Sequence, residues 1–211
     1  MTRIEQLFEL AQGFYTSDDP GHDLAHIQRV MQTCSRLATA ERANGEIALA
    51  GAILHDIVNL PKNHPERKRA SQMAAEKGQE LLRQVGFSAT EIDHVSQVVI
   101  EHSFSLGKKP SSIESAILQD ADRLDALGAI GVMRTVSCGV RLGAGYYSSV
   151  DPFARGRDLD DHSFTIDHFS TKLFKLPELM NTESARAEAN ARVGFMRDFL
   201  QQLEREISLG D

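Results

Sequence analysis

Apolar residues recur at three- and four-residue steps along most of this chain, and that period constrains the fold more than any other feature. Such spacing places apolar side chains on one face of a helix. No strand-like alternation and no internal repeat stand out beside it. The sequence therefore predicts an all-α fold. The pattern is already clear near the N-terminus, at Ile4, Leu7, Phe8, Ala11, Phe14 and Tyr15.

The same spacing predicts further helices, separated by glycine, proline and other turn-forming residues. Asn44-Gly45 is expected to end one helix as a left-handed C-cap, and Ser112 to begin another as its N-cap. Residues 139–161 form a long irregular segment, and such a segment in a compact domain is often a functional lid or wall. The predicted helices lie at about residues 23–43, 46–59, 66–85, 89–102, 113–133, 166–180 and 183–207.

Composition narrows the class of protein. The net charge of −7 argues against a nucleic-acid polymer as partner, because such surfaces are usually basic. No apolar run reaches the length of about 18 residues that a membrane span needs, so no membrane partner is expected. The two cysteines show no CxxC spacing and are interpreted as reduced core residues. We therefore expect a cytoplasmic protein.

The segment 46–59 carries the first chemical anomaly, because its apolar residues point all around the helix axis. A helix with this pattern is buried on every side. His55 and Asp56 nevertheless lie within it, and a buried carboxylate needs a partner or a cation. Taken alone, the dyad leaves open a structural hydrogen bond or a bound ion. Adjacent helix positions do not face each other, which favours an ion between the two side chains.

Two further groups of ligand-type side chains lie elsewhere in the sequence. His26 lies at the edge of an apolar stripe, where a lone histidine is usually a half-exposed surface residue. His22 precedes it by about one turn and would line the same pocket if the helix begins that early. Asp120, Asp122 and Asp125 crowd one helix with apolar flanks, and a divalent cation would offset their repulsion. Helical geometry does not choose among the three aspartates.

These residue types together suit a hard or borderline divalent ion. Imidazole and carboxylate ligands bind manganese, iron, zinc or magnesium, and availability often decides between them. The absence of thiolate ligands disfavours a closed structural zinc site. Four protein ligands on an ion that accepts six would leave positions open for water and substrate.

The order of these residues along the chain resembles a known family pattern. His26, the His55-Asp56 dyad and a later aspartate are similar to the H…HD…D pattern of the HD-domain phosphohydrolase superfamily. The local strings 26–30, 54–57 and 121–125 read HIQRV, LHDI and ADRLD. Residues 22–26, 102–105, 119–131 and 165–172 look like one bacterial branch of nucleotide-hydrolysing or uncharacterised HD proteins.

The resemblance implies a helical bundle with a metal at its centre. It implies that His26, His55, Asp56 and Asp122 are the metal ligands, and Asp122 is chosen here by the family pattern alone. It implies one HD domain over residues 1–211, with a core at about 18–140 and C-terminal helices at 165–208 packing on it. The implied cofactor is one divalent ion, manganese first, with iron, zinc, magnesium, nickel or cobalt as alternatives.

The implied activity is hydrolysis of a small phosphorylated substrate, in particular pyrophosphate release from a nucleoside triphosphate. Phosphates need cations or directed donors. Asp56 and His102 are the expected catalytic residues. A run of basic residues is more often a solvated face, and Arg123 is equally able to pair with a neighbouring aspartate. With these alternatives open, the expected substrate contacts are His22, Lys62, Arg67, His102, Arg123 and Lys172.

One position departs from the family pattern. Related nucleotidases and stringent-response hydrolases carry an acidic residue shortly after the dyad, and here the residue three after Asp56 is Asn59. Asn59 cannot take a proton, so the general base is left open among a metal-bound hydroxide, Asp56, Glu101 and His102. The alternatives to the leading function are a cyclic-nucleotide or dinucleotide phosphodiesterase and a module that binds nucleotide without hydrolysing it. A homodimer is compatible with the sequence.

Overall fold

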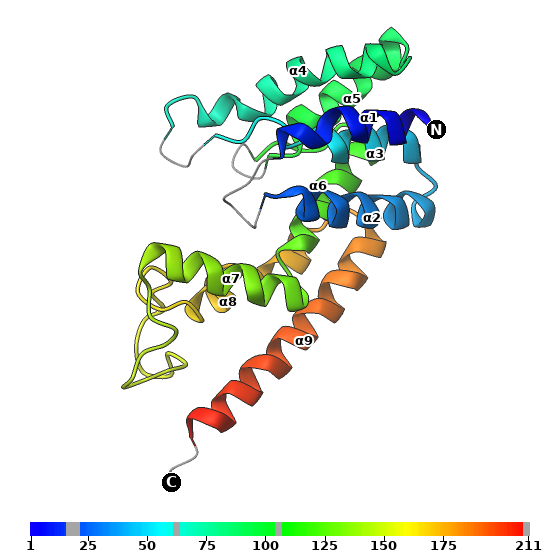
Figure 1. Ribbon diagram of the computed structural model, residues 1–211. Coiled ribbons are helices and arrows are strands. Elements are labelled where there is room, and N and C mark those ends of the chain that lie inside the picture. Colours follow the sequence, from blue (N-terminus) through cyan, green and yellow to red (C-terminus); the bar gives the residue numbers. More distant parts are fainter. Residues whose placement is uncertain (16–21, 61–63, 104–106, 209–211) are drawn as a thin grey trace. The chain divides into compact units, whose positions relative to one another are not determined.

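The computed structural model describes residues 1–15, 22–60, 64–103 and 107–208 (Figure 1). Within these ranges the regular elements are helices, and a single isolated bridge joins Gly145 to Phe164. The predicted all-α class is therefore confirmed. No helix among the described residues is long and apolar enough to cross a membrane.

The chain divides into two compact units, residues 1–122 and 123–211. The expected packing of the C-terminal helices on the core stays a prediction. The first unit contains α1 (Arg3–Ala11), the 3-10 helix η1 (Gln12–Phe14), α2 (Leu24–Ala40), α3 (Gly45–Leu54), the 3-10 helix η2 (Arg67–Arg69), α4 (Ala70–Gln84), α5 (Ala89–Glu101) and most of α6 (Ile113–Asp125).

Helix α3 is the centre of the first unit. It packs against α1, α2, α4 and α5, as its apolar surface on every side predicts. Gly51 lies where α5 and α6 approach it most closely. A Cβ added at Gly51 would lie 2.7 Å from Val98 Cγ1 and 3.4 Å from Leu118 Cδ2. The absence of a side chain at this position therefore lets three helices meet.

Short polar side chains set the beginnings of these helices. Ser88 begins α5 with a capping box, and Asp23 begins α2 by accepting from the His26 N–H. Ser112 accepts the N–H of Ser115 at 3.1 Å, as expected of the cap of α6. The expectation for Asn44 was wrong. Its side chain accepts from Glu46 and Ile47 and so begins α3 rather than ending α2.

The second unit contains the end of α6 and the remaining helices. These are α7 (Gly128–Leu142), α8 (Asp167–Thr171), the 3-10 helix η4 (Leu173–Leu179) and α9 (Glu183–Ile207). The helix predicted over 113–133 is interrupted after Asp125, because Gly128 adopts a left-handed φ of 72°. The helix predicted over 166–180 is instead the short α8 followed by η4, which contains Pro177.

The irregular segment between α7 and α8 is organised by Arg157. Its guanidinium donates to both carboxylate oxygens of the buried Asp167, at 2.5 and 2.9 Å. Its Nε also donates to the Asp151 carbonyl at 2.9 Å. A bidentate pair of this kind holds both partners in one geometry. The segment is therefore tied to the start of α8, and its role as a lid or wall stays a prediction.

Candidate metal centre

The dyad His55-Asp56 lies just beyond the end of α3 rather than inside a helix reaching residue 59. The helix ends at Leu54 because its last carbonyls find other partners. The His55 Nδ1 contacts the Ala52 carbonyl at 2.8 Å, and Ile57 donates to Leu54 at 3.3 Å. The Tyr15 hydroxyl donates to the Ile53 carbonyl. These contacts turn the chain, so His55 and Asp56 leave the helix axis at a place where two ligands can serve one site.

Helix α5 ends in the same way. His102 follows its last residue, and its Nδ1 contacts the Val99 carbonyl at 2.6 Å. A carbonyl only accepts, so Nδ1 of both His55 and His102 carries the hydrogen. The Nε2 of the neutral His55 is then left with its lone pair available for an ion, whereas Asp56 outweighs burial at His102 and raises the pKa of that imidazole. The negative C-terminal ends of α3 and α5 both lie here, and they favour a cation.

His26 and Asp122 reach the same place from α2 and α6. The Nε2 of His26 lies 3.3 Å from the Nε2 of His55 and 3.6 Å from Oδ1 of Asp122. His26 is fully buried and His55 is 1% exposed, whereas the Asp122 side chain is 29% exposed. The cluster is therefore deepest at His26 and His55 and more exposed to solvent at Asp122.

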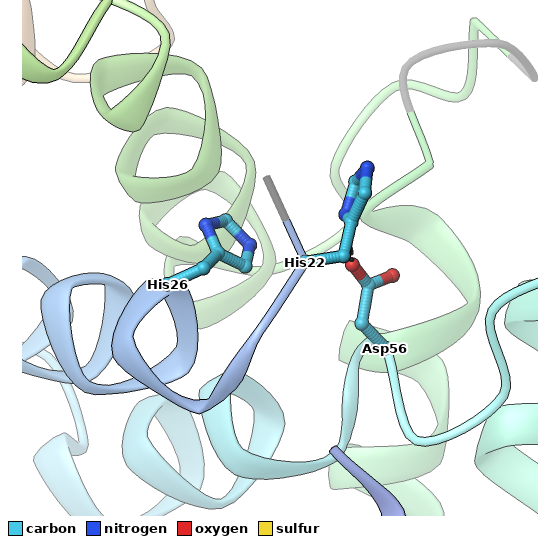
Figure 2. Close-up of side chains that lie close together, drawn as sticks. All are labelled: His22, His26 and Asp56. Carbon is cyan, nitrogen blue, oxygen red and sulfur yellow. Dashed lines mark hydrogen bonds and ion pairs between the residues drawn. The ribbon is translucent and has the colours of Figure 1, made fainter. Parts of the chain in front are cut away.

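Asp56 contacts three histidines. Its Oδ2 lies 2.8 Å from Nδ1 of His22 and 3.7 Å from Nε2 of His55. Figure 2 draws His22 and Asp56 facing each other. The Oδ1 of Asp56 lies 3.7 Å from Nε2 of His102. His22 precedes α2, and its side chain is 30% exposed, against 16% for Asp56. The sequence expected His22 to contact substrate, and the structure gives it a direct contact with a proposed ligand.

The protonation states follow from burial and from these neighbours. Burial lowers the pKa of His55 to about 4, which keeps its imidazole neutral. Burial alone would raise the pKa of Asp56, but the imidazoles of His55, His102 and His22 outweigh it and hold that pKa well below its usual value. Burial is likewise outweighed at Asp122, where His26 and His55 lower the pKa. A neutral His55 beside ionised Asp56 and Asp122 has these three groups in the states in which they bind metals.

This donor set fits a divalent ion. Two groups of three side chains place one ligand atom each within 4.8 Å of the others. One group is His26, His55 and Asp122, and the other is His22, His26 and Asp56. The four ligands that the sequence proposed therefore meet in one place, on α2, on the turn after α3 and on α6. Nitrogen and oxygen ligands of this kind suit manganese, iron or zinc, and they do not select among them.

Four further side chains were proposed to contact substrate, namely Lys62, Arg67, Arg123 and Lys172. Lys62 lies outside the described residues. Arg67 donates through Nη1 to the Leu60 carbonyl, which ties η2 to the chain that follows the dyad. Arg123 and Lys172 belong to the second unit, and Arg123 donates to the Leu179 carbonyl at 2.7 Å. Contact of these four side chains with substrate stays a prediction.

The three aspartates of α6 have separate surroundings. Asp122 alone lies in the ligand groups. Asp125 is 4% exposed and accepts from Arg134 at 2.7 Å, and Asp120 is fully buried. Asp125 ends α6, and its partner Arg134 lies on α7. The family pattern, rather than the helical period, identified the aspartate that lies nearest the histidines.

Comparison with known proteins agrees with this geometry. The model of the HD domain family matches residues 23–127, which contain the four proposed ligands. The uncharacterized protein YpgQ of Bacillus subtilis (strain 168) is 31% identical over 98% of this chain and 95% of its own length. The chain belongs to the HD-domain family.

Solved structures of relatives share the fold over nearly the whole chain. The crystal structure of Bacillus subtilis YpgQ in complex with ADP is 30% identical, covers 98% of this chain and 95% of its own, and has a TM-score of 0.76. An HD-superfamily hydrolase from Bacillus thuringiensis is 32% identical, covers 97% and 96%, and has a TM-score of 0.75. This HD-family protein thus has the fold of HD-superfamily hydrolases.

Proposed function

We propose that this HD-domain protein is a metal-dependent phosphohydrolase that acts on a small nucleotide. The observation that carries the proposal is the meeting of His26, His55, Asp56 and Asp122 from three separate parts of the first unit. A relative of 30% identity has been crystallised with ADP, which supports a nucleotide ligand. By resemblance we propose a nucleoside triphosphate as substrate and pyrophosphate as leaving group.

The proposed roles follow from the contacts. His26, His55, Asp56 and Asp122 would hold a divalent ion, manganese being our first choice. The ion, when bound, supplies Lewis-acid polarisation of the phosphate and lowers the pKa of a bound water. His102 in its protonated form would present an Nε2–H beside Asp56, where it would donate to a phosphate oxygen as negative charge develops. His22 would orient Asp56 through its Nδ1 contact.

The test is a screen of purified protein against nucleotides with each candidate divalent metal, read by release of phosphate or pyrophosphate. We expect His55→Ala and Asp56→Ala to lose at least about 100-fold in kcat, since each removes a ligand of the ion. His94→Ala is the control, because His94 lies on α5 but pairs with Glu114 away from the cluster. Folded His55→Ala protein with full activity would place the site elsewhere. Tight nucleotide binding without product would favour a non-catalytic module.

A second candidate is a phosphodiesterase with two ions. It is favoured by the second ligand group, His22, His26 and Asp56, which shares His26 with the first. Elemental analysis of protein purified without chelators distinguishes the two, because the leading proposal requires one ion per chain. Two ions per chain, together with hydrolysis of cyclic or dinucleotide substrates, would replace it.

A further inference from the structure

Glu101, the last residue of α5, is a buried carboxylate for which the proposed reaction has no fixed use. It is 4% exposed and directly precedes His102. The sequence left it among the candidates for a general base. A base must offer an oxygen to water, so the partners of the Glu101 carboxylate decide between that role and another.

Both carboxylate oxygens of Glu101 are occupied by donors. Oε2 accepts from the Ser111 N–H at 2.9 Å, from the Ser111 hydroxyl at 3.1 Å and from the Ser115 hydroxyl at 2.5 Å. Oε1 accepts from Gln97 Nε2 at 2.6 Å. Ser111 and Ser115 flank the beginning of α6, where a helix favours negative charge. The carboxylate therefore faces the start of α6.

The backbone of Glu101 makes a second connection to the same helix. Its carbonyl accepts from Gln119 Nε2 at 2.8 Å, and Gln119 also donates to the Lys108 carbonyl at 3.0 Å. Gln119 lies three residues before Asp122 on α6. Glu101 thus contacts α6 at two places. Its carboxylate bonds to Ser111 and Ser115 at the start of the helix, and its carbonyl bonds to Gln119, three residues before Asp122.

We propose that Glu101 is a positioning residue that locks the end of α5 to α6 and so sets the spacing of His102 and Asp122. The inference rests on the proposed metal site. Residues that hold metal ligands in place typically account for about 10–100-fold in metal affinity. Replacing Glu101 with an uncharged residue weakens the hydrogen bonds that it accepts from Ser111, Ser115 and Gln97. The contact between the end of α5 and α6 then loosens, while the proposed metal ligands are unchanged.

The test compares Glu101→Gln with Glu114→Gln by calorimetric titration of manganese into metal-free protein. Glu114 is a matched control, since it is 6% exposed, lies on α6, accepts from the Asn44 N–H at 2.9 Å and pairs with His94 at 3.3 Å. We expect Glu101→Gln to bind manganese about tenfold more weakly or worse. Glu114→Gln should stay within about twofold of the wild type, because it leaves the end of α5 untouched.

A second readout does not depend on metal. The imidazole NMR signals of His102 in metal-free protein should move in Glu101→Gln and stay in place in Glu114→Gln. Unchanged His102 signals with unchanged manganese affinity would overturn the proposal, and so would a fall in kcat alone, which is the behaviour of a base. Failure of the wild type to bind any divalent ion would refute the proposed function, while the His102 signals would still test Glu101.

A second variant tests the proposal if Glu101→Gln does not fold. Ser115→Ala removes one of the four donors and keeps the carboxylate. It should weaken manganese binding in the same direction by a smaller factor. An affinity for manganese equal to that of the wild type in Ser115→Ala, together with unmoved His102 signals, would count against the positioning role.

Discussion

A single hydroxyl outside the proposed metal site helps to determine where α3 ends. Tyr15 is 7% exposed and donates to the Ile53 carbonyl, in the last turn before His55. Burial, together with the nearby charge of Asp56, raises the pKa of Tyr15 well above its usual value, so the phenol remains a donor. A buried carbonyl without a donor costs free energy, and Tyr15 removes that cost at the turn that carries the dyad.

Tyr15→Phe tests this contact because it deletes the hydroxyl and keeps the buried ring. We expect the free energy of unfolding, measured by urea titration, to fall by about 1–3 kcal/mol. Tyr146→Phe is the control, since Tyr146 is 60% exposed and its change should stay within about 0.5 kcal/mol. Equal stability of Tyr15→Phe and the wild type would mean that water or another donor replaces the hydroxyl.

At the residue scale, the sequence predicted the proposed ligands but not the long-range contacts made by Tyr15 and Glu101 near the ends of α3 and α5. His26, His55 and Asp56 were identified because their spacing matches a family pattern, and the structure brings them together. Tyr15 was interpreted only as part of an apolar stripe, and Glu101 only as a candidate base. Their partners lie 38 residues away for Tyr15 and up to 18 for Glu101, and no local period encodes such contacts.

At the element scale, the packing around α3 leaves no room for a side chain at Gly51. A Cβ there would lie 2.7 Å from Val98 Cγ1, closer than side chains pack. We expect Gly51→Ala to lower the free energy of unfolding by about 1–3 kcal/mol, because Val98 must leave its preferred rotamer or the helices must separate. Gly45→Ala on the same helix is the control.

Urea titration of both alanine variants is the measurement. At Gly45 the added Cβ would meet only Ala38 Cβ at 3.9 Å, an ordinary contact. Alanine has the higher helix propensity, so Gly45→Ala should be neutral or stabilising by up to about 1 kcal/mol. Similar destabilisation of the two variants would show that backbone effects, rather than the contact with Val98, decide the outcome at Gly51.

Helix α1 is tied to α3 and α5 through Arg3, and this tie is sensitive to acid. The guanidinium of Arg3 contacts Glu46 at 2.6 Å and Glu91 at 2.9 Å. The Arg3 hydrogen bond, followed by those from Ser88, lowers the pKa of Glu91 from 4.5 to about 2. Between these values the unfolded chain binds more protons than the folded one, so stability is lost as pH falls from 4.5 towards 2.

In Glu91→Gln, the free energy of unfolding should therefore depend less on pH between 4.5 and 2 than in the wild type. It keeps the oxygen that completes the Ser88 capping box but removes the titrating group. The difference in unfolding free energy between wild type and variant should be largest above pH 4.5 and shrink towards pH 2, by urea titration at several pH values. Glu9→Gln, at an exposed position of α1, should leave the profile unchanged. Parallel wild-type and Glu91→Gln profiles would refute the assignment.

Helix beginnings were easier to predict than helix ends. The cap Ser112 was expected from local sequence, because a short polar side chain reaches an N–H only three residues on. The end of α3 at Leu54 and the interruption before Gly128 depend on tertiary partners and on one backbone conformation. The apolar period continues through both places, so it predicted helices that were too long.

At the scale of the whole molecule, each compact unit contains one cysteine and the proposed ligands lie in only one unit. Cys34 is fully buried on α2, two turns after His26, and burial raises the pKa of its thiol. Cys138 is partly exposed on α7, in the second unit. A thiol reagent thus reports on opening of the first unit at Cys34, whereas it reaches Cys138 in the folded protein.

Manganese binding should consequently protect Cys34 from labelling and leave Cys138 unaffected. If the opening that exposes Cys34 also separates the ligands, saturation at 100 times Kd slows its labelling by about 100-fold. The measurement is the rate of thiol labelling at each cysteine, resolved by peptide mass spectrometry, with and without metal. His26→Ala should abolish the protection of Cys34, because it removes the ligand that both groups share. Equal protection of both cysteines, or of neither in the wild type, would contradict an ion held within the first unit.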